Sequence, residues 1–278
     1  MSKSFKEQVE LNPNSVLIVD SLNLCFRFKH SKAKVFADDF IETVRSLARS
    51  YKCGKIILTC DQGSSSYRKE IYPEYKANRA EKYANQTEQE AKDFEAFFIE
   101  FNRTMELAAE YFPLLRYNKV EADDIAAYLV SKLKDTHTIW LISSDKDWEL
   151  LVCDTVSKFS YVTRKETTIN NWNQHHECSP EEYISIKCLQ GDSGDNIKGI
   201  EGIGPKRALE LVKQYGSAFD IHAALPIPSK YKYIKALNDS GDTILTNYKL
   251  MDLITYCEEA IGQENLKEID KKLKELNV

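Results

Sequence analysis

Three carboxylates stand close together at Glu121, Asp123 and Asp124, at the head of an apolar run that is typical of a helix. A helix start favours acids because its free N–H groups and dipole are positive, which accounts for one or two of them. Six more aspartates fall at the ends of other segments: Asp20, Asp61, Asp145, Asp147, Asp192 and Asp195. Mg²⁺ prefers carboxylate oxygens and takes only a few from a protein. The nine acids therefore predict a divalent-metal site with room for two ions.

Two divalent ions about 4 Å apart can activate an attacking water and stabilise the leaving oxygen of a phosphodiester. Carboxylates gathered without such ions would repel one another and destabilise the fold. We therefore expect divalent ions to stabilise the protein and the chemistry to be phosphodiester hydrolysis.

Apolar runs that end in an acid give the fold class. Such runs cover residues 15–20 and 55–61, and a third, residues 138–143, is followed by Asp145 and Asp147. Weaker strand patterns lie at 114–117 and 159–162, and an amphipathic helix is predicted at 38–50. Alternating strands and helices predict an α/β fold with a mainly parallel sheet, whose ligands bind beyond the carboxyl ends of the strands. A single acid after a strand is often only a cap or turn residue, but three strand ends share this feature.

A long insertion, residues 67–112, separates the second strand from the third. In its first part Arg68, Lys69, Lys76, Arg79 and Lys82 alternate with Tyr72, Tyr75 and Tyr83. Basic and aromatic side chains in alternation hold single-stranded nucleic acid, although a charged surface loop would have the same composition. The later part has apolar residues at helical spacing and is expected to be a crossover helix.

The pattern turns helical after residue 178. Ser179 and Glu182 form a capping box for a helix that runs to about residue 190, and a second helix is predicted over 205–215. Between them lie Gly199, Gly202 and Gly204, followed by Lys206 and Arg207. Glycines let backbone N–H groups approach phosphates, and a helix start that carries two basic side chains is a natural phosphate site. A tight helix–helix turn is the plainer interpretation of the glycines alone.

These motifs together resemble the structure-specific 5′-nucleases, which include flap endonucleases, the 5′-nuclease domain of bacterial DNA polymerase I and bacteriophage 5′→3′ exonucleases, with the T-odd type most similar. The resemblance runs from about residue 15 to near the end of the chain. It rests on Ile18-Val19-Asp20, Asp61, Pro73-x-Tyr75-Lys76-x-x-Arg79, Glu121-Ala122-Asp123-Asp124, Ser144-Asp145-Lys146-Asp147, Gly191-Asp192-x-x-Asp195-Asn196 and Gly199-x-x-Gly202-x-Gly204-Pro205. One departure is Ser21, because the family usually has glycine after the first aspartate.

The resemblance implies two Mg²⁺ or Mn²⁺ ions. One would be held by the group Asp20, Asp61, Glu121, Asp123 and Asp124, and the other by the group Asp145, Asp147, Asp192 and Asp195. It also implies that Lys76 and Arg79, at the base of a helical arch, contact the scissile phosphate and that Tyr75 stacks on a base. Arg68 would be a further DNA contact.

The resemblance also implies a domain organisation and a substrate. A catalytic domain would span residues 1–178, with the arch at about 68–112, and a helical DNA-binding region 179–278. The latter would contain a helix–three-turn–helix at about 180–216 with K⁺ bound at 199–204. The substrate would be DNA with a 5′ single-stranded flap or a branched duplex, cut by a monomer during DNA replication.

Composition limits the alternatives. The net charge of −5 looks wrong for a DNA-binding protein, but setting the nine acids aside leaves 34 acids against 38 bases. Seven cysteines without paired spacing indicate reduced thiols, and no stretch has the pattern of a signal peptide or a membrane span. We expect a cytoplasmic protein, in the host cytoplasm if phage-encoded. A PIN-like metal-dependent endoribonuclease and a catalytically inactive binding protein remain as alternatives.

Overall fold

The computed structural model describes residues 10–31 and 33–278. Its core is a six-stranded sheet in the order β3-β2-β1-β4-β5-β6, in which the five strands from β3 to β5 are parallel and β6 is antiparallel. The strands are β1 (Asn12–Asp20), β2 (Cys53–Cys60), β3 (Leu114–Arg116), β4 (Thr138–Ile142), β5 (Val156–Ser160) and β6 (Lys165–Thr167). The order reverses between β1 and β4, which is where α/β sheets place their ligands.

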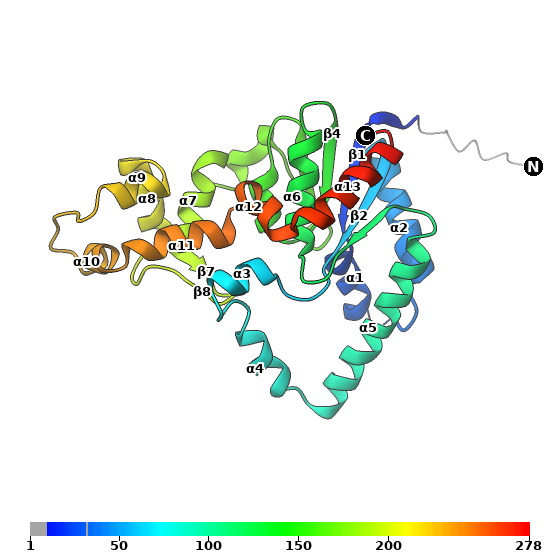
Figure 1. Ribbon diagram of the computed structural model, residues 1–278, viewed down its shortest axis with the longest axis horizontal. Helices are drawn as coiled ribbons and strands as arrows, with labels where there is room; N and C mark the ends of the chain where they lie inside the picture. Colours follow the sequence, from blue (N-terminus) through cyan, green and yellow to red (C-terminus); the bar gives the residue numbers. More distant parts are fainter. Residues whose placement is uncertain (1–9, 32) are drawn as a thin grey trace, which may run out of the picture.

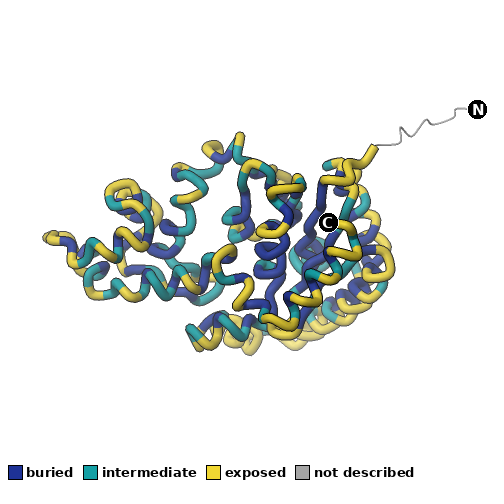
Figure 2. Tube along the Cα trace, turned by 45° about the horizontal axis from the view of Figure 1, so that its top comes forward, coloured by how far each residue is buried: buried dark blue, intermediate teal, exposed yellow. Residues whose placement is uncertain are grey.

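Helices cover both faces of this sheet (Figure 1). Apolar side chains of α6 (Ala122–Leu133), α12 (Leu253–Ile261) and α13 (Gln263–Glu275) share one buried core with the sheet. Those of α1 (Ser21–His30), α2 (Ala37–Ser50) and α5 (Glu88–Ala108) share the other. The interior strands are covered on both sides, and Figure 2 shows them as the most buried part of the molecule.

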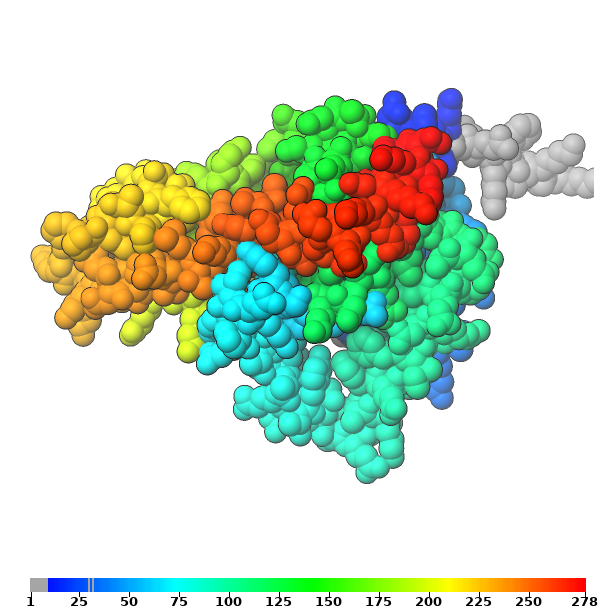
Figure 3. Space-filling model, viewed as in Figure 1, coloured from blue at the N-terminus to red at the C-terminus, as the bar shows by residue number. Residues whose placement is uncertain are grey.

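The insertion between β2 and β3 projects from the body (Figures 1 and 3). It consists of α3 (Ser66–Ile71), α4 (Asn78–Ala84) and the long α5, which begins with a complete capping box at Thr87 and Glu90. Only the second half of α5 is buried against α2, so α4 and the first turns of α5 stand out from the body. This is the predicted arch.

A third core holds the helical region at the far end of the molecule. Its elements are α7 (Pro180–Gln190), the short strands β7 (Gly191–Asp192) and β8 (Ile197–Lys198), α8 (Pro205–Tyr215), α9 (Ala218–Ala223), α10 (Lys232–Asp239) and α11 (Gly241–Met251). Of the two 3₁₀ helices, η1 (Asp147–Leu151) joins β4 to β5, and η2 (Ile169–Gln174) connects β6 to α7. The capping box at Ser179 and the helix over 205–215 are confirmed.

Several sequence expectations differ from the structure. The fifth strand begins at Val156 rather than at residue 159, and α1 was not predicted. Residues 12–14, expected in a loose leader, belong to β1, while residues 1–9 lie outside the described residues. The expected helical region 179–278 does not stay together, because α12 and α13 return to the sheet and fill the core against α6. Their apolar spacing fits either core, so the pattern alone could not show which one they join.

Candidate metal and nucleic-acid site

The carboxyl ends of β1, β2 and β4 bring Asp20, Asp61 and Asp145 to one edge of the sheet, and the first turn of α6 adds Asp123. We call these four residues the acidic cluster. Burial and then repulsion from Asp145, Asp61 and Asp20 raise the pKa of Asp123 well above its ordinary value. Burial and repulsion from Asp61 raise the pKa of Asp20 to about 8. The predicted convergence of these acids is therefore present in the fold.

Neutral groups orient the acidic cluster. Asp20 accepts hydrogen bonds from the hydroxyl of Ser143 at 2.8 Å and from the N–H of Asn23 at 3.1 Å. Asp61 accepts one from the N–H of Ala122 at 2.6 Å, and Asp123 accepts one from the indole of Trp148. Within residues 10–31 and 33–278, no Lys, Arg or His side chain forms an ion pair with any of the four. The four carboxyl groups are thus held in place by neutral donors, and burial and mutual repulsion favour their protonated forms.

The remaining five acids, which we call the paired acids, each contact a basic side chain. They are Glu121, Asp124, Asp147, Asp192 and Asp195. Glu121 is buried and accepts hydrogen bonds at 2.8 Å from both Lys76 Nζ and the hydroxyl of Tyr75. Burial alone would raise the pKa of Glu121, but attraction to Lys76 and Arg68 outweighs it and lowers that pKa.

Arg68 and Asp124 form a buried bidentate ion pair, with distances of 2.7 and 2.8 Å. Arg68 is 4% exposed and also donates to the backbone oxygen of Leu250 at 2.8 Å, while Asp124 is 1% exposed. The expected DNA contact of Arg68 is contradicted by this burial. The expected metal ligation by Asp124 does not fit either, because both of its oxygens are bound to Arg68.

Tyr75 lies beneath the surface, at 2% exposure, and its ring contributes to the third core. Its hydroxyl is within hydrogen-bond distance of Glu121 and of Asp195, at 2.8 and 2.9 Å. A ring enclosed in this way cannot stack on a base, so this expectation is also corrected. Tyr75 instead connects the base of the arch to acids from two distant segments.

The other two residues predicted at the base of the arch, Lys76 and Arg79, lie next to Asp195. Lys76 has a positive φ of 57°, and its N–H donates to the backbone oxygen of Asp195 at 2.9 Å. Arg79 donates to the Asp195 carboxylate at 2.8 Å and is half-exposed. These contacts fix both cations beside the acidic cluster, where Lys76 offsets part of the repulsion at Asp61 and Asp123.

Sequence reasoning missed Lys187 on α7. Its ammonium lies 2.7 Å from Asp147 and 3.6 Å from Asp192, so it joins two acids that the sequence placed in one group. A lone lysine in a helix gives no signal of such a role. Lys158 was missed for the same reason: it is buried and donates to the Asp145 backbone oxygen at 2.6 Å and to Glu149 at 2.9 Å.

The glycine hairpin, residues 199–204, connects β8 to α8 as a compact turn. Gly202 has a φ of +77°, and a Cβ at Gly199 would lie 2.0 Å from the Gln190 backbone oxygen, so glycine is needed at both positions. Gly204 caps α8, and Lys206 is exposed in its first turn. The backbone N–H groups at this helix start and Lys206 suit a phosphate.

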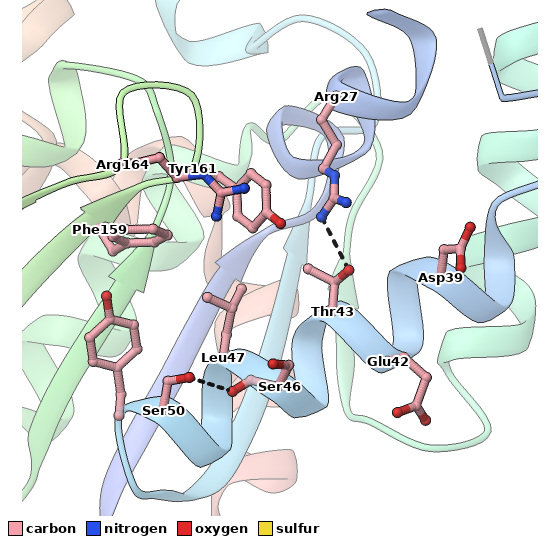
Figure 4. A pocket seen from close by; sticks show the side chains of 11 residues that line it. Arg27, Asp39, Glu42, Thr43, Ser46, Leu47, Ser50, Phe159, Tyr161 and Arg164 are labelled. Atoms are coloured by element: carbon pink, nitrogen blue, oxygen red, sulfur yellow. Dashed lines mark hydrogen bonds between the residues drawn. The ribbon is translucent and has the colours of Figure 1, made fainter. Parts of the chain in front are cut away.

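A hollow of about 550 Å³ opens between α1, α2 and the end of β5 (Figure 4). The guanidinium groups of Arg27 and Arg164 lie 4.3 and 3.9 Å from the ring centroid of Tyr161. Asp39 and Glu42 line the same hollow, which balances its charge. No spacing in the sequence indicated this grouping.

The donor set of the acidic cluster suits a divalent metal. The acidic cluster offers only carboxylate oxygens, the ligands of hard divalent ions, and lacks protein cations to neutralise them. In the part of the chain that the structure describes, no three His, Cys, Asp or Glu side chains form a ready metal-binding group. The chemistry of the donors fits a divalent metal.

A parallel sheet with such an acidic cluster, two cations at the base of an arch and a glycine hairpin defines a metal-dependent nuclease. The model of the 5′-3′ exonuclease N-terminal resolvase-like domain matches residues 15–179, and that of the C-terminal SAM fold matches residues 178–273. The chain belongs to the 5′-3′ exonuclease family, and the fold and the family expected from the sequence are confirmed.

Individual relatives agree with this family. The chain is 42% identical to the flap endonuclease of Escherichia phage T5 over 285 residues, which covers 99% of this chain and 98% of that one. It is 31% identical to DNA polymerase I of Rhizobium leguminosarum over 69% of this chain and 17% of that one.

Solved structures of phage T5 D15 give the same result. The D15 protein co-crystallized with metal ions matches with a TM-score of 0.90 and 43% identity, over 94% of this chain and 99% of that one. D15 flap endonuclease as a pseudo-enzyme-product complex with DNA and metal ions matches with a TM-score of 0.91 and 43% identity, over 94% of this chain and 98% of that one. In residues 10–31 and 33–278, no helix has the length and apolar character needed to cross a membrane.

Proposed function

We propose that this nuclease hydrolyses DNA near junctions of single and double strands, as a 5′→3′ exonuclease and flap endonuclease. The products are a 5′-phosphate and a 3′-hydroxyl, and the setting is DNA replication in the cytoplasm, in the host cell if the protein is phage-encoded. One observation carries the proposal. The acidic cluster forms no ion pair of its own among the described residues, and it lies beside Lys76 and Arg79, which are paired with Glu121 and Asp195.

The proposed ligands of two Mg²⁺ or Mn²⁺ ions centre on Asp20, Asp61, Asp123 and Asp145. Glu121, Asp147, Asp192 and Asp195 would contribute after releasing their lysine or arginine partners, and Asp124 is left to hold Arg68. When bound, divalent ions supply Lewis-acid polarisation of the phosphate and lower the pKa of an attacking water. The neutral hydrogen-bond donors keep the carboxylates oriented without competing for their charge.

Lys76 and Arg79 are the proposed catalytic side chains of the arch. The N–H groups of Lys76 donate to Glu121, and those of Arg79 donate to Asp195. A scissile phosphate could accept the same hydrogen bonds in place of these carboxylates. Donors already held in position stabilise charge that develops on the phosphate oxygens. The arch position, where a 5′ single strand would pass, then selects branched substrates.

The proposed duplex contact is the hairpin with Gly199, Gly202, Gly204, Lys206 and Arg207. N–H groups and lysine bind phosphates without reading sequence, as a structure-specific enzyme requires. A K⁺ ion at residues 199–204 is part of this proposal, and so is the action of the protein as a monomer. One duplex held at the hairpin would place its junction at the acidic cluster.

The decisive experiment mixes the protein and Mg²⁺ with end-labelled DNA carrying a 5′ flap, and in parallel with a matched RNA flap. We expect cleavage of the DNA near the junction and little cleavage of the RNA. Preferential cleavage of the RNA would favour the PIN-like endoribonuclease, and binding without cleavage of either would favour the inactive binding protein. The family assignment disfavours both alternatives.

A further inference from the structure

Residues 230–235 carry an alternating pattern of lysine and tyrosine, Lys230-Tyr231-Lys232-Tyr233-Ile234-Lys235. They lie between α9 and α10 and in the first turn of α10, at the left end of the molecule in Figures 1 and 3, away from the arch. Ile234 is buried and anchors the segment, whereas the three lysines are exposed. The segment therefore presents three positive charges around its two tyrosines.

The two tyrosine rings are stacked on each other. Their centroids are 5.7 Å apart with an interplanar angle of 23°, and Tyr231 is 57% exposed. The guanidinium of Arg207 lies 4.4 Å from the ring centroid of Tyr233 and donates to the Gly202 backbone oxygen at 2.6 Å. We call the stacked pair of Tyr231 and Tyr233 the tyrosine platform. Arg207 connects it to the glycine hairpin.

A hollow of about 210 Å³ opens beside the platform. Its walls include the apolar Leu211, Ile227 and Ile234, and the polar Glu210 and Gln214. The carboxylate of Glu210 would repel a phosphate. The apolar walls, a tyrosine ring for stacking, the Glu210 acceptor and the Gln214 amide together suit a planar nucleobase with polar edges. The negative charges of a bound strand would instead lie along the exposed lysines.

We infer that the tyrosine platform is a second nucleic-acid site, which binds an unpaired base of single-stranded DNA, with Lys230, Lys232 and Lys235 contacting its phosphates. Exposed aromatic rings flanked by lysine or arginine side chains are the usual means by which proteins hold single strands. The site is separate from the arch and from the backbone N–H groups of the hairpin. It rests on the proposed function only in taking DNA as its ligand.

The test uses the full chain with a chelator, so that no DNA is cut. A short single-stranded oligodeoxynucleotide that contains 2-aminopurine reports stacking through quenching of its fluorescence, and anisotropy gives its Kd. Wild type should quench the probe. Tyr231→Ala should lose the quenching and weaken single-strand binding about five- to hundredfold, which is the effect of one base stack. Tyr231→Phe, which keeps the ring, should retain both.

Two controls make the outcome decisive. Tyr111 follows the end of α5 and is 54% exposed. Tyr111→Ala therefore removes an exposed ring at a different place, and it should leave both the quenching and the Kd for single-stranded DNA unchanged. A blunt duplex of equal length should bind Tyr231→Ala as it binds wild type. Equal weakening for single strand and duplex, or unchanged binding of both, would overturn the inference. Failure of the wild type to cut a flap would count against the proposed function alone, because the binding assay needs no cleavage.

Discussion

The acidic cluster and the paired acids are in electrostatic contact, yet their environments are opposite. Glu121 acts on the pKa of Asp61, and Asp145 acts on that of Asp147. In the cluster, hydroxyl and N–H groups orient the carboxylates and leave their charge uncompensated. Among the paired acids, four basic side chains neutralise that charge.

The difference separates two roles that the sequence could not distinguish. Uncompensated carboxylates at the edge of a sheet make a receptor for cations. Compensated carboxylates make tethers: Arg68 and Asp124 connect α3 to α6 and α11, and Asp195 connects the arch to the helical region. Asp124 therefore serves construction alone, whereas the other four paired acids hold the arch and α7 in place and become proposed metal ligands only when their basic partners are released.

The largest effect should come from breaking the most deeply buried tether. Arg68→Ala leaves Asp124 charged without a partner, and we expect the free energy of unfolding to fall by about 3–5 kcal/mol, measured by urea denaturation. Arg68→Met combined with Asp124→Leu should recover most of this loss. Lys92→Ala removes an exposed pair with Glu88 and should cost less than about 1 kcal/mol. A loss as small for Arg68→Ala would show that Asp124 is not a tether.

The next effect concerns an arch cation rather than stability. Lys76→Ala should lower kcat on 5′-flap DNA about 10²- to 10³-fold, because a positioned donor to the phosphate is lost, with a smaller change in Kd. Lys69→Ala, an exposed lysine on α3, should leave kcat nearly unchanged. Single-turnover cleavage and anisotropy measure the two quantities. A loss confined to Kd would make Lys76 a binding residue only.

How much of this site the sequence could predict depends on the range of the interactions. The acids at Asp20, Asp61 and Asp145 follow from strand patterns, since parallel strands must end at one edge. The position of Asp123 follows from its place in the first turn of α6. These placements are fixed by local sequence and by sheet geometry, so they could be predicted.

The ion pairs could not be predicted in this way. Arg68 and Asp124 are 56 residues apart, and Lys187 and Asp147 are 40 apart, with no local pattern that relates them. Basic and aromatic alternation predicted a surface role for Tyr75, but two carboxylates within reach of its hydroxyl account for its burial. The same kind of alternation at 230–235 does lie at the surface, which shows that composition alone does not decide between the two.

Divalent ions should separate the two acid groups more finely. Without DNA, Mg²⁺ at about 100 times its Kd should raise the free energy of unfolding by about 2.7 kcal/mol. Asp123→Asn should lose most of this gain and be more stable than wild type in a chelator, because burial and repulsion no longer act on a carboxyl group at this position. Asp39→Asn, an exposed change on α2, should keep the gain. Thermal unfolding with and without Mg²⁺ measures the gain. Equal stabilisation of both variants would place the ion elsewhere.

The finest distinction between the two groups is a pH slope of opposite sign. The pKa of Asp20 is about 8 in the folded protein against about 3.9 in an unfolded chain, so between these values the folded state retains a proton that the unfolded state has released. Stability should therefore fall as pH rises, by at most about 1.4 kcal/mol per unit, until pH passes 8. The lowered pKa of Glu121 acts in the other direction, since its contribution is lost only as pH falls below about 4.3.

Measurements between pH 5.5 and 8 therefore isolate the acidic cluster from Glu121. Denaturation of wild type and Asp20→Asn in a chelator, compared at each pH, cancels the groups that both proteins share. We expect the difference to grow in favour of the variant as pH rises, and to shrink with Mg²⁺, because bound ions favour the charged carboxylate. A difference that is constant with pH would mean that Asp20 is ionised throughout this range, so that burial and repulsion from Asp61 do not govern its charge.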